Sequence, residues 1–226
     1  QIGMDGKRRE GKHRTLYLLH GMSDDHTIWL RRTSIGRYVA DKGIAVVMTA
    51  VHKSRYSNLT TGDRYWDYIS EEVPALAREF FNLSEKREDN YVAGLSMGGY
   101  GAWKMALNKP EMFCAGASLS GSIYTDWESR SRRPGGHELA FGSREEFAGS
   151  VNDLVHVATR LSESAGPKPR LYQCCGTGDF LYDNNQKFRK IMETLDYDYT
   201  YEEGPGTHEW GYWDMMIQRV LDWFDL

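Results

Sequence analysis

Short apolar runs alternate with stretches of helical periodicity along most of this chain. Runs that are apolar at nearly every position are typical of strands buried on both faces of a parallel sheet. We expect strands at Thr15–His20, Ile44–Thr49, Asn90–Gly94, Cys114–Leu119, Arg170–Cys175 and Asp198–Glu202. We expect helices at Ser34–Lys42, Tyr65–Phe81, Gly98–Leu107, Asn184–Thr194 and Tyr212–Phe224. This alternation predicts an α/β fold, in which helices flank a mostly parallel central sheet through right-handed crossovers.

Three local signals refine this pattern. Gly43 is a suitable C-terminal cap for the helix at Ser34–Lys42. Pro74 marks a kink or a new start within Tyr65–Phe81, because proline cannot donate a helical hydrogen bond. The polar residues Val51–Asp63 are expected to form a loop.

Residues 121–169 interrupt the alternation. They are rich in Ser, Gly, Arg and Glu, with helical signals only near Arg144–Phe147 and Asn152–Leu161. Because this segment follows the strand after the helix Gly98–Leu107, we expect a small cap insertion within a single domain of residues 1–226. The alternative is a surface excursion with no part in substrate binding.

The pentapeptide Gly94-Leu95-Ser96-Met97-Gly98 lies between a predicted strand and a predicted helix. A Gly-x-Ser-x-Gly in that context is the nucleophile elbow pattern. The turn is so tight that Gly94 and Gly98 cannot carry side chains, and Ser96 must adopt a strained backbone conformation. Its hydroxyl then stands above the sheet at the positive end of the following helix. A chance match in a glycine-rich loop is the alternative, and the strand–turn–helix context argues against it.

A serine hydroxyl is barely ionised at neutral pH, so Ser96 needs a base. His208 is the preferred candidate, because its glycine-rich loop follows the last strand on the same sheet edge; His52 is a weaker rival. Asp179 directly follows a strand and is the preferred acceptor for the imidazole, although Asp183 competes. We prefer Asp179 because Asp183 suits a helix start. The order Ser96, Asp179, His208 is the one expected of this architecture.

The negative oxygen of a tetrahedral intermediate also needs hydrogen-bond donors. The backbone N–H of Met97, directly after the nucleophile, is one expected donor. The second is expected from the loop after the first strand, with the Met22 amide as the candidate. Trp29 and Trp210 are candidates for the substrate pocket from their loop positions alone. This chemistry requires no metal and no cofactor.

The charge and the cysteine content limit the possible binding partners and the cellular compartment of the protein. A net charge of −4 and a pI near 6.0 argue against nucleic acid as the main partner. No apolar stretch is long enough to cross a bilayer. Three cysteines, two of them adjacent, do not indicate a disulfide scaffold, so reduced thiols in a cytoplasmic protein are the simplest interpretation. The oligomeric state stays open, with a homo-oligomer among the alternatives.

Four blocks in this order give the chain a specific resemblance over nearly its whole length: Leu18–Met22, Gly94–Ala102, Gly176–Tyr182 and Tyr201–Trp210. The chain resembles the esterase D-like family of α/β-hydrolases, especially the bacterial tributyrin esterase type. The resemblance implies hydrolysis of short-chain carboxylic esters through an acyl-enzyme. The chain also resembles S-formylglutathione hydrolases, feruloyl and acetyl-xylan esterases, and mycolyltransferases, which share this scaffold. A thioesterase or a carbohydrate-acyl esterase therefore remains an alternative, and a non-catalytic binding protein of this fold a remote one.

The chain departs from that family at its N-terminus. The family places further strands before the one at Thr15–His20, and this chain has almost no room for them. The strand Ile44–Thr49 would then lie at a sheet edge, although its apolar composition suits a central strand. Our hypothesis is that N-terminal strands of the natural protein are missing from this chain.

Overall fold

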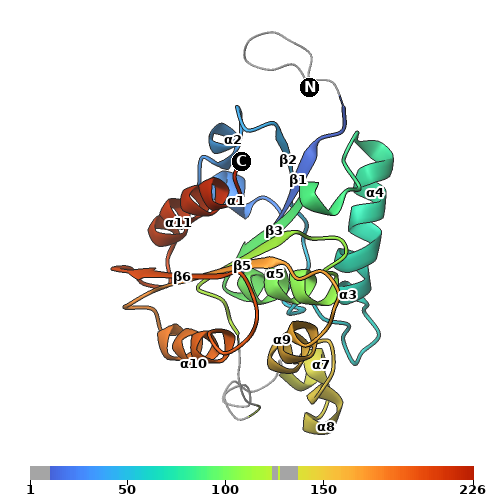
Figure 1. Ribbon diagram of the computed structural model, residues 1–226, viewed down its shortest axis with the longest axis vertical. Helices are drawn as coiled ribbons and strands as arrows, with labels where there is room; N and C mark the ends of the chain where they lie inside the picture. Colours follow the sequence, from blue (N-terminus) through green and yellow to red (C-terminus); the bar gives the residue numbers. More distant parts are fainter. Residues whose placement is uncertain (1–10, 124–126, 128–136) are drawn as a thin grey trace.

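A single parallel sheet organises the part of the chain that the computed structural model describes, residues 11–123, 127 and 137–226 (Figure 1). The strands of this part are β1 (Arg14–Leu19), β2 (Ile44–Val47), β3 (Asn90–Leu95), β4 (Ala115–Leu119), β5 (Arg170–Gly176) and β6 (Tyr199–Gly204). They lie in the order β2-β1-β3-β4-β5-β6, and every neighbouring pair is parallel. The predicted α/β fold with a parallel central sheet is confirmed.

Helices cover both faces of this sheet (Figure 1). On one face lie α1 (Ile28–Arg32), α2 (Ile35–Tyr38) and α11 (Trp210–Trp223). On the other lie α3 (Tyr65–Asp67), α4 (Val73–Phe80), α5 (Met97–Asn108), α9 (Leu154–Ser162) and α10 (Tyr182–Met192). Two short helices, α7 (His137–Phe141) and α8 (Arg144–Phe147), complete the segment 121–169 together with α9.

The strands are apolar at nearly every position because each contributes to two cores. In β1, Tyr17 and Leu19 belong to the core beneath α5, whereas Leu16 and Leu18 belong to the core beneath α11. Successive side chains of a strand point to opposite faces, so a strand covered on both sides needs apolar residues throughout. The cysteines at 114, 174 and 175 are free thiols, as expected.

Several helix boundaries differ from the prediction. The helix expected at Ser34–Lys42 is reduced to α2, although Gly43 does adopt the left-handed conformation of a cap, with φ of 65°. Pro74 is the second residue of α4 and follows helical backbone, because Glu72, before α4, also has helical φ and ψ. The turn before it, Tyr68–Glu72, is π-helical and joins α3 to α4. Pro74 therefore lies where the helix type changes from π to α, within one continuous helical run of residues 65–80.

The segment 121–169 matches its helical signals in part. The helix α8 spans Arg144–Phe147 as predicted, and α9 begins two residues after the predicted Asn152. The helix α7 was not predicted, and residues 124–126 and 128–136 lie outside the described residues. The helix α9 packs against α5, the helix that follows Ser96.

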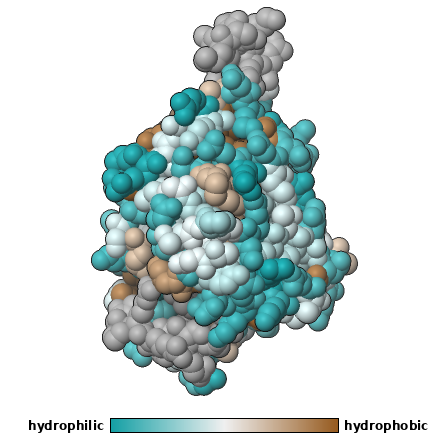
Figure 2. All heavy atoms as spheres, turned by 90° about the vertical axis from the view of Figure 1, so that its left-hand side faces the viewer, coloured by the Kyte–Doolittle hydropathy of each residue, from teal (hydrophilic) through white to brown (hydrophobic). Residues whose placement is uncertain are grey.

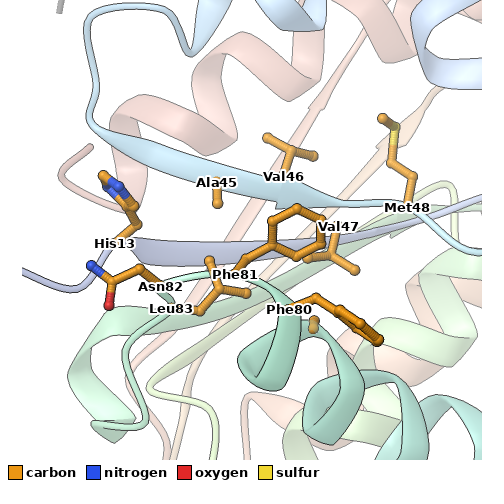
Figure 3. A pocket seen from close by; sticks show the side chains of 10 residues that line it. His13, Ala45, Val46, Val47, Met48, Phe80, Phe81, Asn82 and Leu83 are labelled. Carbon is orange, nitrogen blue, oxygen red and sulfur yellow. The ribbon is translucent and has the colours of Figure 1, made fainter. Parts of the chain in front are cut away.

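The strand β2 lies at the edge of the sheet that the described residues form, as predicted. Beside it is a hollow of about 640 Å³ between this strand and the end of α4, with apolar walls (Figure 3). The labelled lining residues are His13, Ala45, Val46, Val47, Met48, Phe80, Phe81, Asn82 and Leu83. Whether further N-terminal strands exist in the natural protein stays a prediction.

The outer surface is mostly hydrophilic on the face shown in Figure 2, with only small apolar areas. Among the described residues, no helix combines the length and apolar character needed to cross a membrane.

The buried ring of Trp103 tests how far the α5 core stabilises the fold. The ring is fully buried, donates a hydrogen bond to the Tyr172 carbonyl at 3.1 Å and packs against Phe188. We expect Trp103→Ala to lower the free energy of unfolding by about 3–5 kcal/mol, because it leaves a cavity and an unpaired carbonyl. Phe80→Ala, at a position that is 75% exposed, should change it by no more than about 0.5 kcal/mol. Urea denaturation measures both, and equal losses would contradict this account of the core.

Candidate active site

The backbone of Ser96 adopts a conformation that L-residues rarely take. Its φ of 53° and ψ of −115° place it in the turn between β3 and α5. A Cβ on Gly98 would lie 2.5 Å from the Leu19 carbonyl oxygen, and a Cβ on Gly94 would overlap the Gly98 carbonyl. Both glycines are therefore required by close backbone approach, as the elbow pattern predicts.

Hydrogen bonds hold the strained residue on both sides. The Ser96 amide donates to the Leu119 carbonyl at 2.9 Å, and the Ser96 carbonyl accepts from the Ser122 amide at 2.8 Å. Strained conformations persist only where the surrounding structure determines them in this way. Met97 is the first residue of α5, so its amide is among the N–H groups that have no acceptor within the helix.

The structure brings Ser96, His208 and Asp179 together from three loops at the carboxyl ends of β3, β6 and β5. The His208 Nε2 atom lies 2.9 Å from the Ser96 hydroxyl, and Nδ1 lies 2.8 Å from the nearer Asp179 carboxylate oxygen. An ionised carboxylate only accepts hydrogen bonds, so Nδ1 carries the proton and Nε2 can accept from the hydroxyl.

The rival residues lie elsewhere. Asp183 is in the first turn of α10, as its alternative role as a helix-start residue implied. His52 is exposed, and its ring contacts the Tyr65 ring edge-on at 6.0 Å.

The Asp179 carboxylate is stabilised in its charged form although its side chain is fully buried. Burial alone would raise the pKa of Asp179. Hydrogen bonds from His208 and from the Leu181 amide, at 2.8 Å, outweigh burial and hold that pKa below its ordinary value. Asp179 therefore remains ionised at neutral pH and can orient the imidazole.

The loop that carries Met22 is fixed by the buried ring of His20. Its Nε2 accepts a hydrogen bond from the Val51 amide at 3.0 Å, so Nδ1 donates to the Gly21 carbonyl at 2.7 Å. The Tyr56 hydroxyl donates to the His20 carbonyl at 2.8 Å. Burial lowers the pKa of His20, which keeps the ring neutral and suits it to this structural role.

A hollow of about 440 Å³ opens in front of Ser96. Its walls are Gly21, Met22, Asp24, Leu95, Ser96, Phe180, His208, Glu209, Trp210 and Trp213. Trp210 thus lines the hollow, as expected for a pocket residue. Trp29 lies behind it: the ring is 1% exposed, donates to the Leu19 carbonyl and meets the Trp210 ring edge-on at 5.3 Å. Trp29 supports the wall and does not form part of it.

Comparisons with known proteins show which family this chain belongs to. The Esterase family model matches residues 5–224. The chain belongs to the Esterase family. It is 28% identical over 219 residues to an acetyl esterase of Caldicellulosiruptor saccharolyticus, covering 93% of this chain and 82% of the relative.

Two solved structures from Staphylococcus aureus are similar to this Esterase-family chain over most of their lengths. The fluorophosphonate-binding serine hydrolase F (FphF) has a TM-score of 0.88 and 34% identity, covering 98% of this chain and 87% of that one. The S-formylglutathione hydrolase FrmB has a TM-score of 0.85 and 35% identity, covering 96% of this chain and 85% of that one. These two neighbours, one a serine hydrolase and the other an S-formylglutathione hydrolase, confirm the α/β-hydrolase fold.

Several residues that line this esterase-family site were not predicted from the sequence. The Phe180 ring is 61% exposed and lies 4.5 Å from the His208 ring, and Trp213 meets the same ring edge-on at 4.8 Å. Phe180 directly follows Asp179 in the sequence, and this position could have identified it as a residue of the hollow. The helical spacing of Trp213 indicated core packing, and the ring does pack there while also contacting His208.

Two carboxylates at the hollow were also missed. Asp24 lies next to the Met22 loop, and burial raises its pKa. Glu209 caps α11 by accepting from the Gly211 and Tyr212 amides. The hollow therefore has two acidic walls and, among its described lining residues, no lysine or arginine.

The strain at Ser96 predicts an unusual order of stabilities between two variants. Both Ser96→Ala and Ser96→Gly remove the hydroxyl, but only glycine relieves the unfavourable φ. We expect Ser96→Gly to be more stable than Ser96→Ala by about 1 kcal/mol, after the larger unfolded-state entropy of glycine is subtracted from the strain. Chemical denaturation compares the two directly, and an alanine variant at least as stable would contradict the strain.

Proposed function

We propose that this protein is a serine carboxylesterase that hydrolyses short-chain acyl esters through an acyl-enzyme intermediate. The observation that carries the proposal is the hydrogen-bonded chain from Ser96 through His208 to Asp179, at the N-terminus of α5. Membership of the Esterase family supports it. The name of the acetyl esterase relative supports a short acyl group.

In the first half of the reaction, the Ser96 oxygen forms a bond to the ester carbonyl carbon while His208 Nε2 takes the hydroxyl proton. The carbonyl oxygen becomes negative and is stabilised by the backbone amides of Met22 and Met97. Each such donor contributes on the order of 3 kcal/mol to the transition state. The ester C–O bond then breaks, and the imidazolium gives its proton to the departing alcohol.

In the second half, water replaces the alcohol. His208 takes a proton from water as the water oxygen bonds to the acyl carbon, and the same amides stabilise the new tetrahedral intermediate. The bond to Ser96 breaks, the acid leaves, and the proton returns to the serine oxygen. Asp179 stays ionised throughout and stabilises the imidazolium. No metal or cofactor takes part in this sequence. We expect the segment 121–169 to act as a small cap over Ser96 within a single domain of residues 1–226.

A second candidate is thioester hydrolysis on S-formylglutathione, favoured by the 35% identity to FrmB. The charge of the hollow argues for the ester. Glutathione carries a net negative charge, and Asp24 and Glu209 line the hollow beside His208. The values of kcat/KM for p-nitrophenyl acetate and S-formylglutathione separate the two, and we expect the acetate ester to be preferred.

The nucleophile is tested by removing its oxygen. We expect Ser96→Ala to lower kcat for p-nitrophenyl acetate by on the order of 10⁵- to 10⁶-fold, because no acyl-enzyme can form. The variant should also lose labelling by a fluorophosphonate probe while keeping the wild-type circular dichroism spectrum. Folded Ser96→Ala protein that retains activity would refute the mechanism.

The assignment of the acid has a matched control in the neighbouring aspartate. Asp179→Asn removes the charge that fixes the imidazole tautomer, so we expect kcat to fall by about 10⁴-fold. Asp183→Asn changes the same group one helical turn away, outside the hydrogen-bonded chain, and should leave kcat within about twofold. Steady-state kinetics on both variants decides, and a larger loss for Asp183→Asn would reverse the assignment.

A further inference from the structure

Three aromatic side chains line the hollow of about 440 Å³ in front of the nucleophile. The rings of Trp210 and Trp213 are perpendicular, with their centroids 5.3 Å apart, and the buried Trp29 ring packs behind Trp210. The Phe180 ring is 61% exposed, and its centroid lies 4.5 Å from that of the His208 ring. The face of an aromatic ring carries partial negative charge, so these rings can attract a cation as well as apolar groups.

Two carboxylates add negative charge to the same hollow. A Cβ on Gly21 would lie 3.2 Å from the Asp24 Oδ2 atom and 3.7 Å from the Ser96 Cβ atom. Only the width of Gly21 therefore separates the Asp24 carboxylate from the nucleophile. Glu209 directly follows the catalytic histidine and lines the hollow from the start of α11.

The charge of Asp24 is not neutralised by an ion pair. Across the described ranges, 11–123, 127 and 137–226, none of the ion pairs involves Asp24. Arg31 pairs instead with the neighbouring Asp25, at 3.6 Å. The described residues that line the hollow include no lysine or arginine. A cation carried by the substrate would therefore meet complementary charge in the hollow, whereas an anion would be repelled.

The path of the proton connects these walls with the leaving alcohol. His208 must deliver its proton to the alcohol oxygen as the ester bond breaks, so that oxygen lies within hydrogen-bond reach of Nε2. The Phe180 and Trp213 rings both contact the His208 ring, at 4.5 Å and 4.8 Å between centroids. A group a few bonds from the alcohol oxygen therefore lies beside these rings.

We propose that the hollow binds an ammonium group on the leaving alcohol, so that the preferred substrates are short-chain esters of cationic amino alcohols. This inference rests on the proposed function and specifies its substrate class. The aromatic rings contact the ammonium group, and Asp24 and Glu209 supply the opposite charge. A neutral alcohol of the same shape keeps the apolar contacts but loses the attraction to the ring faces and to the carboxylates.

The test compares acetylcholine with 3,3-dimethylbutyl acetate, its uncharged carbon analogue. The acetyl group is the same, and a tert-butyl group replaces the trimethylammonium group. Because the charge also makes choline the better leaving group, each kcat/KM is divided by the rate constant for hydroxide-catalysed hydrolysis of the same ester. We expect this normalised kcat/KM, measured by pH-stat titration of the released acid, to favour acetylcholine by at least about tenfold in the wild type.

Two substitutions separate the two sources of attraction. Asp24→Asn removes a carboxylate, and Phe180→Leu removes a ring while keeping an apolar side chain at an exposed position. We expect each to lower the normalised preference for acetylcholine by about threefold or more, mainly through the KM for acetylcholine.

A matched control removes the adjacent charge. Asp25 pairs with Arg31 and does not line the hollow, so Asp25→Asn should change the preference far less than Asp24→Asn. A normalised wild-type ratio near one or below it would overturn the proposal, and so would ratios for Asp24→Asn and Phe180→Leu equal to that of the wild type. The wild-type ratio decides by itself if the variants do not fold. Failure of the proposed function looks different, because folded wild-type protein would then hydrolyse neither acetate ester nor p-nitrophenyl acetate.

Discussion

The tight turn at Ser96 is the constraint on which the rest of the structure depends. A φ of 53° at a serine persists only if the chain is fixed on both sides of it. The sheet fixes one side through the Leu119 carbonyl, and the contact of Gly98 with the Leu19 carbonyl fixes the other. Helix α5 must therefore begin where β1, β3 and β4 end, which makes this edge of the sheet the place where reacting groups can converge.

The same edge allows a buried carboxylate to remain charged. Asp179 and His208 follow β5 and β6, which pair in parallel up to Gly176 and Gly204. This backbone pairing alone places the two loops side by side. The hydrogen bonds from His208 and the Leu181 amide then lower the pKa of Asp179 against the effect of burial. Backbone register thus determines the electrostatics of the site.

The structure could be predicted from the sequence where a local constraint requires a particular type of residue. Buried strands need apolar runs and the elbow needs its two glycines, so the sheet and the positions of Ser96, Asp179 and His208 could be predicted. Features that depend on distant contacts could not. The loop Val51–Asp63 was predicted from its polar residues, yet its residues 54–57 are buried. Lys104, from α5, donates hydrogen bonds to two of them, at the Tyr56 carbonyl and the Ser57 hydroxyl. Phe180 gave no periodic signal because its role depends on the His208 ring in another loop.

The buried side chain of Lys104 shows how a contact from a distant element determines the structure of this loop. Lys104 is fully buried, and besides its two loop contacts its ammonium donates to the Asn152 side chain at 2.6 Å and lies 4.3 Å from the Trp66 ring centroid. All three of its protons have acceptors, so its burial is explained by the structure it holds together.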